Sequence, residues 1–136
     1  MILILQSLWN RSLTDNLVKG AEDFLRSQDL RTRVIQVPGA LELPLALKWA
    51  LEADQKKEIQ GAVACGVVIK GDTYHFEMVA NESSRGLSDL SLQFGIPVGH
   101  AVLATYDISQ AIARSQGEQN KGLEAAKAVN EMIKLK

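Results

Sequence analysis

Residues 63–81 read Val-Ala-Cys-Gly-Val-Val-Ile-Lys-Gly-Asp-Thr-Tyr-His-Phe-Glu-Met-Val-Ala-Asn, and this stretch decides the fold. Its first part, residues 63–69, is apolar and mostly β-branched, which predicts a buried strand. After the break at residues 70–72, apolar and small residues recur at the three-and-four spacing of a helix: Phe76, Val79, Ala80, Ser83, Leu87, Leu90 and Phe94. The stretch therefore predicts a strand, a tight turn and a helix.

The residues of this turn are suited to binding an anion. Gly71 accepts backbone angles that are closed to other residues, and Asp72 and Thr73 are residue types that begin helices. The N–H groups at the start of the helix point beyond the strand end, where they favour a phosphate. His75 in the first turn adds a proton carrier. The same residues could also do no more than cap the helix, and the stretch alone leaves both alternatives open.

Length and composition indicate one globular domain spanning residues 1–136, with 46% hydrophobic residues, 23% charged residues and a net charge of −1. The chain has no basic excess, so we expect no nucleic-acid partner. No apolar run approaches the roughly 20 residues that cross a bilayer, so we expect no membrane partner. Residues 1–5 lack a basic leader and read as a strand rather than a signal peptide, which favours a cytoplasmic location.

The single cysteine and the two histidines suggest neither a disulfide nor a metal site. Cys65 has no partner for an internal disulfide, and its place inside an apolar strand favours a buried core residue over a nucleophile. His75 and His100 belong to different predicted elements without a clear third ligand. We therefore expect no metal.

Strands are predicted at residues 2–5, 32–37, 63–69 and 98–105, and a helix follows each of them. The first helix ends near Gln28, the second begins with Pro44 in its first turn, and Asp107 with Gln110 resembles a capping box. A further helix ends the chain. This alternation predicts an α/β fold, a three-layer αβα sandwich around a four-stranded parallel sheet with the flavodoxin-like strand order 2-1-3-4.

Open parallel sheets bind their ligands beyond the carboxyl ends of the strands. Those ends hold Trp9, then Glu42 behind the Pro38-Gly39 turn, then Thr73 and His75. Trp9 could be a core residue or a flat wall for a planar ring, and Glu42 could simply complement a helix dipole. Because all these residues converge on one edge of the sheet, we expect a binding site there.

The chain resembles the lumazine synthase family, whose members make 6,7-dimethyl-8-ribityllumazine in the penultimate step of riboflavin biosynthesis. The resemblance covers nearly the whole chain and depends on the order and spacing of several motifs. These are Trp9-Asn10, Val37-Pro38-Gly39-Ala40-Leu41-Glu42-Leu43-Pro44, Gly71-Asp72-Thr73-Tyr74-His75-Phe76-Glu77 with Asn81-Glu82, and Arg114 with Asn120-Lys121-Gly122.

The resemblance implies a transferase that condenses 5-amino-6-(D-ribitylamino)uracil with 3,4-dihydroxy-2-butanone 4-phosphate, releasing phosphate and water without a cofactor. It implies His75 as the proton-transfer residue, and Gly71, Asp72, Thr73 and Arg114 around the phosphate. The residues implied at the pyrimidine and the ribityl chain are Trp9, Asn10, Ala40, Leu41, Glu42, Val67, Val68, Ile69, His100 and Lys121.

Members of this family form pentamers whose active sites lie between neighbouring subunits. The resemblance therefore implies a homo-oligomer in which Arg114, Lys121 and the fourth strand serve a neighbour's site. Taken from this chain alone, Arg114 would be a surface helix charge. In many members a strand ahead of the position of Met1 adds to a neighbour's sheet. Because this sequence begins at Met1, we expect a pentamer more than a larger closed shell.

Five positions depart from the family pattern. Leu41 stands where many members have an aromatic residue, Lys70 where arginine is usual, and Asp72 where alanine or glutamate is common. His100-Ala101 replaces a frequent Phe-Gly pair in the fourth strand. The phosphate and proton-transfer positions are kept, so the departures concern mainly the packing around the pyrimidine.

Three other functions fit the sequence less well. A mononucleotide-binding electron carrier would need a phosphate loop rich in glycine and hydroxyl groups after the first strand, and residues 7–12 contain no glycine. A catalytically silent ligand-binding relative is disfavoured by the retained Thr73, His75 and Arg114. A phosphoacceptor regulator would need an acidic pair to hold magnesium where the first strand ends, and none is present there.

Overall fold

The computed structural model describes all residues, 1–136. Four parallel strands, β1 (Ile2–Ser7), β2 (Thr32–Val37), β3 (Gly61–Ile69) and β4 (Val98–Thr105), form one sheet in the order β2-β1-β3-β4. The helices are α1 (Arg11–Ser27), α2 (Leu43–Ala53), α3 (His75–Phe94), α4 (Ile108–Arg114) and α5 (Lys121–Leu135). Single 3₁₀ turns, η1 (Ala40–Glu42) and η2 (Gly117–Gln119), precede α2 and α5. The predicted fold class and strand order are confirmed.

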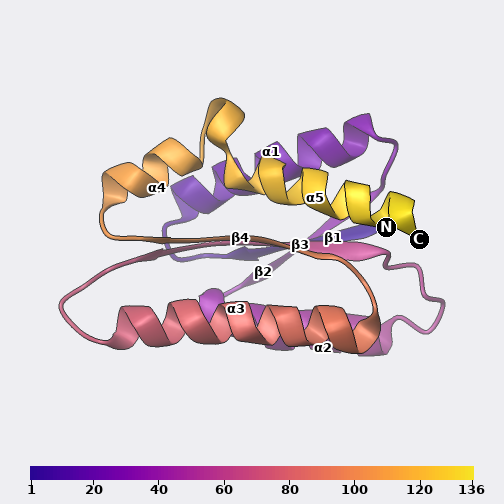
Figure 1. Ribbon diagram of the computed structural model, residues 1–136, viewed down its shortest axis with the longest axis horizontal. Helices are drawn as coiled ribbons and strands as arrows, with labels where there is room; N and C mark the ends of the chain where they lie inside the picture. Colours follow the sequence, from indigo (N-terminus) through magenta and orange to yellow (C-terminus); the bar gives the residue numbers. More distant parts are fainter.

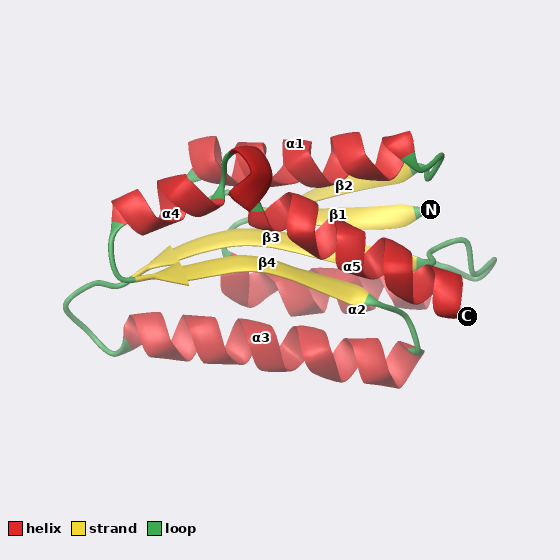
Figure 2. Ribbon diagram, turned by 45° about the horizontal axis from the view of Figure 1, so that its top comes forward, coloured by secondary structure: helices red, strands yellow, loops and turns green.

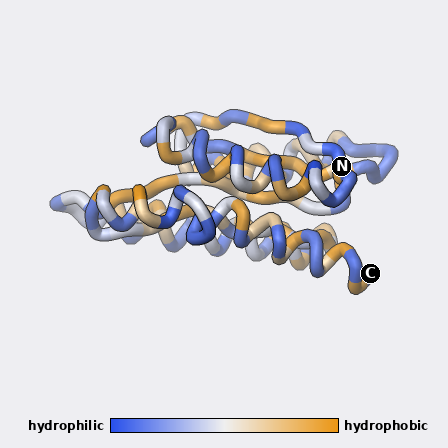
Figure 3. The backbone as a smooth tube through the Cα atoms, turned by 90° about the horizontal axis from the view of Figure 1, so that it is seen from above, coloured by the Kyte–Doolittle hydropathy of each residue, from blue (hydrophilic) through white to orange (hydrophobic).

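The sheet is the middle one of three layers (Figure 1). One face is covered by α1, α4 and α5, and the other by α2 and α3. Because helices cover both faces of the sheet, the central strands β1 and β3 need apolar side chains on both faces. In Figure 3 the hydrophobic colouring runs along the strands, whereas the helices alternate between hydrophilic and hydrophobic segments. None of the helices is both long enough and apolar enough to span a bilayer.

The core side chains of the central strands alternate between the two layers. Ile4 and Cys65 pack with α1 and α5, whereas Leu5 and Ala64 pack with α2 and α3. Cys65 is fully buried, and this burial raises the pKa of its thiol to about 12 because a thiolate would lose its hydration. The prediction of a core cysteine, rather than a nucleophile, is confirmed.

The first strand is longer than predicted because two polar residues are buried at its end. β1 continues through Gln6 and Ser7, which are 2% and 1% exposed. The Gln6 amide group donates to Thr14 Oγ1 at 3.1 Å and to Asp15 Oδ1 at 2.6 Å. These hydrogen bonds to α1 offset the cost of burying an amide, which hydropathy alone does not reveal.

The predicted start of α3 was wrong by two to three residues. The helix begins at His75, and its N-cap residue is Tyr74, which makes no side-chain capping bond, rather than Asp72 or Thr73. Gly71 does not have a positive φ; among glycines, only Gly95 and Gly117 do. The reason is that the chain follows β4 one residue further, with Lys70 N–H donating to Thr105 O at 2.8 Å, and then loops outward before it coils.

The start of α4 has the predicted capping chemistry, and a glycine ends α3. Asp107 Oδ1 accepts from Gln110 N–H at 2.9 Å, and Gln110 Oε1 accepts from Tyr106 N–H at 2.8 Å. This is the expected capping box, with the return bond made one residue earlier. Gly95 ends α3 with a φ of 65°, a conformation that costs glycine little.

The Asn120-Lys121-Gly122 motif joins α5 to α1. Asn120 Oδ1 accepts from Gly122 N–H at 2.8 Å, and Asn120 Nδ2 donates to Asn16 O at 2.9 Å. A Cβ atom placed on Gly122 would lie 1.9 Å from Leu17 O. Only glycine allows this approach of the two helices, and the motif therefore fixes where Lys121 begins α5.

We predict that Gly122→Ala destabilises the fold by about 1–3 kcal/mol, because the two helix backbones must separate. Urea denaturation followed by circular dichroism measures the change. Gly71→Ala is the matched control, since a Cβ there meets no atom within 4 Å and Gly71 has no positive φ. Its stability should stay within about 0.5 kcal/mol of the unmodified protein. Equal stability of the two variants would contradict this account of the α1–α5 contact.

Candidate active site

The strand register brings the carboxyl ends of the strands to one edge. Ser7 pairs with Val37 across β1 and β2, and Ile69 pairs with Thr105 across β3 and β4. The arrowheads of β3 and β4 in Figure 2 end together, beside the loops that lead to α3 and α4. The predicted site residues of the first three strand ends therefore lie along a common edge of the sheet.

We name these residues the strand-end group. Its members are Trp9, Asn10, Ala40, Leu41, Glu42, Val67, Val68, Ile69, Gly71, Asp72, Thr73 and His75. They come from the loops after β1 and β2 and from the end of β3 with its following loop.

Trp9 is not a core residue, because 72% of it is exposed. Asn10 turns the chain into α1 with a φ of 57°, a left-handed conformation that asparagine tolerates, and its Nδ2 donates to Val67 O at 3.5 Å. This long hydrogen bond links the ends of β1 and β3. Trp9 is thus presented to solvent beside the end of β3.

The side chains of Trp9 and Glu42 both lie beside Gly39. A Cβ atom placed on Gly39 would lie 3.0 Å from Glu42 Oε2 and 3.2 Å from Trp9 Cδ1. Glu42 makes no capping hydrogen bond to α2, so its carboxylate is free to accept from a ligand. Beside them Ala40 is buried, whereas Leu41 is 45% exposed. A flat aromatic ring and a free carboxylate therefore face the same space.

The loop after β3 combines an anion site with a proton carrier. The backbone N–H groups of residues 71–74 donate to no acceptor within the chain. Thr73 Oγ1 accepts from His75 N–H at 3.4 Å, a weak contact, and the side chains of both residues are exposed. At the end of β3, Val67 is buried and Val68 and Ile69 are half-buried, which gives the loop a rigid apolar base.

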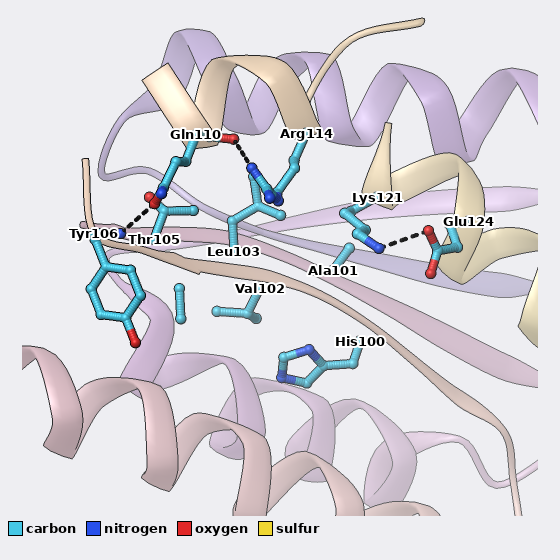
Figure 4. Close-up of a pocket in the computed structure, with 11 residues that line it drawn as sticks. His100, Ala101, Val102, Leu103, Thr105, Tyr106, Gln110, Arg114, Lys121 and Glu124 are labelled. Carbon is cyan, nitrogen blue, oxygen red and sulfur yellow. Dashed lines mark hydrogen bonds and ion pairs between the residues drawn. The ribbon is translucent and has the colours of Figure 1, made fainter. Parts of the chain in front are cut away.

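The remaining predicted site residues lie in a separate cavity. His100, Arg114 and Lys121 line a space of about 430 Å³ along β4, together with Gln110, Glu124 and residues 101–106 (Figure 4). We call this space the β4 cavity. Its lining includes no member of the strand-end group. Within one chain, the predicted site residues therefore fall into two separate sets, the strand-end group and the lining of the β4 cavity.

The two cations of the β4 cavity keep donors available. Arg114 Nη1 donates to Gln110 O at 3.0 Å, which occupies one of the five N–H donors of a guanidinium. Lys121 Nζ donates to Glu124 Oε2 at 2.8 Å in a partly exposed ion pair. Figure 4 shows Arg114 and Lys121 descending from α4 and α5 on one side of β4, with His100 on the other side.

β4 is an edge strand, so its outer backbone groups have no strand partner in the chain. The cavity follows this open edge. Arg114 and Lys121 therefore lie beside the open edge of the sheet, apart from the strand-end group.

Sequence reasoning missed several residues of this region. Tyr106 is 70% exposed, its ring centroid lies 5.6 Å from Lys70 Nζ, and it packs against Phe76 at 6.2 Å between ring centroids. Its place after β4 could have identified it. Glu124 stands three residues after Lys121, a spacing that pairs side chains on a helix. The bond between Ser84 and His100 had no sequence signal.

No group of three or more His, Cys, Asp and Glu side chains is arranged to hold a metal ion. The chemistry that these residues offer is binding of an anion, stacking on an aromatic ring and proton transfer by imidazole.

Comparison with known proteins identifies the family. A family model described as 6,7-dimethyl-8-ribityllumazine synthase matches residues 1–136. The 6,7-dimethyl-8-ribityllumazine synthase of Azorhizobium caulinodans is 44% identical, with 99% of this chain and 85% of the relative covered. Those of Xanthobacter autotrophicus and Agrobacterium fabrum are each 41% identical over 99% of this chain, covering 84% and 93% of the relatives. The chain belongs to the 6,7-dimethyl-8-ribityllumazine synthase family.

Proposed function

We propose that this protein is the riboflavin-pathway transferase that makes 6,7-dimethyl-8-ribityllumazine. It condenses 5-amino-6-(D-ribitylamino)uracil with 3,4-dihydroxy-2-butanone 4-phosphate and releases phosphate and water. The observation that carries the proposal is the loop of residues 71–75, where unbonded N–H groups, the Thr73 hydroxyl and the His75 imidazole lie together.

The reaction needs positioning and proton transfer more than any other assistance. An amine of the pyrimidine adds to the ketone and a first water leaves, phosphate is then eliminated, and a second amine adds to the remaining carbonyl and closes the ring with loss of a second water. Holding the two substrates together makes the first step effectively unimolecular. In this proposal the N–H groups of Gly71, Asp72 and Thr73 bind the phosphate, and His75 moves protons during addition and elimination.

The pyrimidine binds beside the loop that follows β1. Trp9 stacks on the ring, and Glu42 accepts hydrogen bonds from its polar edge or from the ribityl hydroxyls. Support comes from the exposure of Trp9 and from the free carboxylate of Glu42 at Gly39. Asn10, Ala40, Leu41 and the end of β3, Val67–Ile69, complete this part of the site.

The complete site forms between two subunits of a homopentamer. Arg114 adds the guanidinium that the phosphate lacks in its own chain, and Lys121 adds a second cation. The support is the separation of the β4 cavity from the strand-end group, together with the open edge of β4. A neighbour docked along β4 would place its strand-end group against Arg114.

The purified protein, mixed with both substrates, should generate the absorption and fluorescence of the lumazine product. His75→Ala should lower kcat about 100-fold, near the lower end of general acid–base effects, because the substrates are still held together. The inhibition constant of inorganic phosphate should change little, since the N–H groups that bind it remain. His75→Ala with wild-type turnover would remove His75 from the mechanism, and no product from the unmodified protein would overturn the proposed function.

Ligand binding should quench the emission of Trp9. In Trp49→Phe protein, Trp9 is the only tryptophan, and stacking on a bound pyrimidine should reduce its fluorescence. The matched control is Trp9→Phe, which leaves only Trp49, a residue of α2 that is 63% exposed. This control protein should show no ligand-dependent quenching. Unchanged emission from Trp9 at saturating ligand would contradict the stacking role.

Subunit mixing tests the shared site. His75→Ala and Arg114→Ala proteins, each nearly inactive, should regain activity when co-assembled, because some interfaces pair an intact His75 with an intact Arg114. In an equal random mixture about a quarter of the interfaces carry both groups, so activity should approach one quarter of the wild-type value. Mixed assemblies without recovery would show that both residues serve a site within the same chain.

A further inference from the structure

The loop of residues 71–74 makes few hydrogen bonds of its own. Its backbone N–H groups donate to no acceptor in the chain, and its only side-chain hydrogen bond is the weak contact of Thr73 Oγ1 with His75 N–H at 3.4 Å. A Cβ atom placed on Gly71 would meet no atom within 4 Å. The conformation of this loop therefore depends on how its two ends are held.

Both ends of the loop contact one aromatic ring, that of Tyr106. Lys70, the residue before the loop, places its Nζ over this ring at 5.6 Å from the centroid. Phe76, in the first turn of α3, packs on the same ring with 6.2 Å between centroids and an interplanar angle of 46°. Lys70 makes no ion pair, so the ring is the partner of its ammonium group. A cation over a ring face and a tilted pair of rings are both attractive arrangements.

The backbone at Tyr106 is fixed from outside the loop. Tyr106 N–H donates to Gln110 Oε1 at 2.8 Å in the capping box of α4, and Thr105 O, the carbonyl just before it, accepts from Lys70 N–H at 2.8 Å. Figure 4 shows the ring extending from the end of β4 towards α3, with Gln110 and Arg114 on the other side of the strand. Because 70% of Tyr106 is exposed, its side chain contributes little to the core, and its contacts are with the two ends of the loop.

We propose that Tyr106 is a positioning residue for the phosphate loop. Its ring holds Lys70 and Phe76 at the two ends and thereby keeps the N–H groups of residues 71–74 in the arrangement that binds the phosphate. The inference rests on the proposed function of that loop. A loop that is already in its bound conformation loses less conformational entropy on binding, so its affinity for phosphate is higher. Tyr106 acts through the loop of its own chain and does not itself contact the phosphate.

Titration with inorganic phosphate in a calorimeter measures this role without turnover. Tyr106→Ala removes both ring contacts, so the dissociation constant of inorganic phosphate should rise about three- to tenfold. Tyr106→Phe keeps the ring and should bind phosphate within about twofold of the unmodified protein. In steady-state kinetics, Tyr106→Ala should raise the KM for 3,4-dihydroxy-2-butanone 4-phosphate by a similar factor, whereas the KM for the pyrimidine should stay within about twofold.

A double-mutant cycle separates positioning from a direct contact with the ligand. Lys70→Met keeps the hydrocarbon stem but loses the charge that lies over the ring. If the ring acts through Lys70, Tyr106→Ala should weaken phosphate binding less in the Lys70→Met background than in the unmodified protein. Lys70→Arg, whose guanidinium also stacks on aromatic rings, should bind phosphate at least as tightly as the unmodified protein. Leu92→Ala is the matched control, because Leu92 is an 86% exposed side chain near the other end of α3 and its truncation should leave all constants unchanged.

The outcomes distinguish this inference from the proposed function. Circular dichroism checks the fold of each variant, and Tyr106→Leu, which keeps apolar bulk without a ring face, replaces Tyr106→Ala if that variant does not fold. Unchanged phosphate affinity in the folded variant, or additive effects in the cycle, would overturn the positioning role and leave the proposed function standing. An unmodified protein that binds no inorganic phosphate would also overturn the inference. If the phosphate affinities change as expected but the unmodified protein forms no lumazine, the proposed function is wrong and Tyr106 still positions an anion-binding loop.

Discussion

The rest of the structure depends on the parallel pairing of β1 with β3, which buries both strands on both faces. Every side chain of β1 is buried, and the pairing of Ile2 with Gly61 sets the register of the central pair. A parallel sheet must be covered by helices on both sides, and its crossovers return each chain to the same end. The loops after the strands therefore collect at one edge, and these loops carry Trp9, Glu42 and His75.

The layer of α1, α4 and α5 carries the cations Arg114 and Lys121, whereas the strand-end group contains no cation. Asn120 caps α5 and holds α1, and Gly122 lets the two helix backbones touch. As a result Lys121 begins α5 at a defined place, and Arg114 ends α4 beside it. A motif that looks like a binding signature in sequence thus has a packing role as well, since it positions the cation that it contains.

The division between the strand-end group and the β4 cavity connects fold with function. β4 lies at an edge of the sheet, so the residues that line the cavity beside it lie apart from the strand-end group of the same chain. In the proposed pentamer each subunit supplies the phosphate loop for one site and the cations for another.

The sequence by itself determined the strands, the helices, their order along the chain and the family motifs, because apolar spacing and turn residues are local signals. It also placed His75 in the first turn of α3 and Cys65 in the core. Only the tertiary structure decided that Trp9 is exposed, that Gln6 is buried with satisfied hydrogen bonds, and that Ser84 holds His100. Such contacts join side chains from different elements, and their geometry depends on how the layers pack rather than on any periodicity within one element.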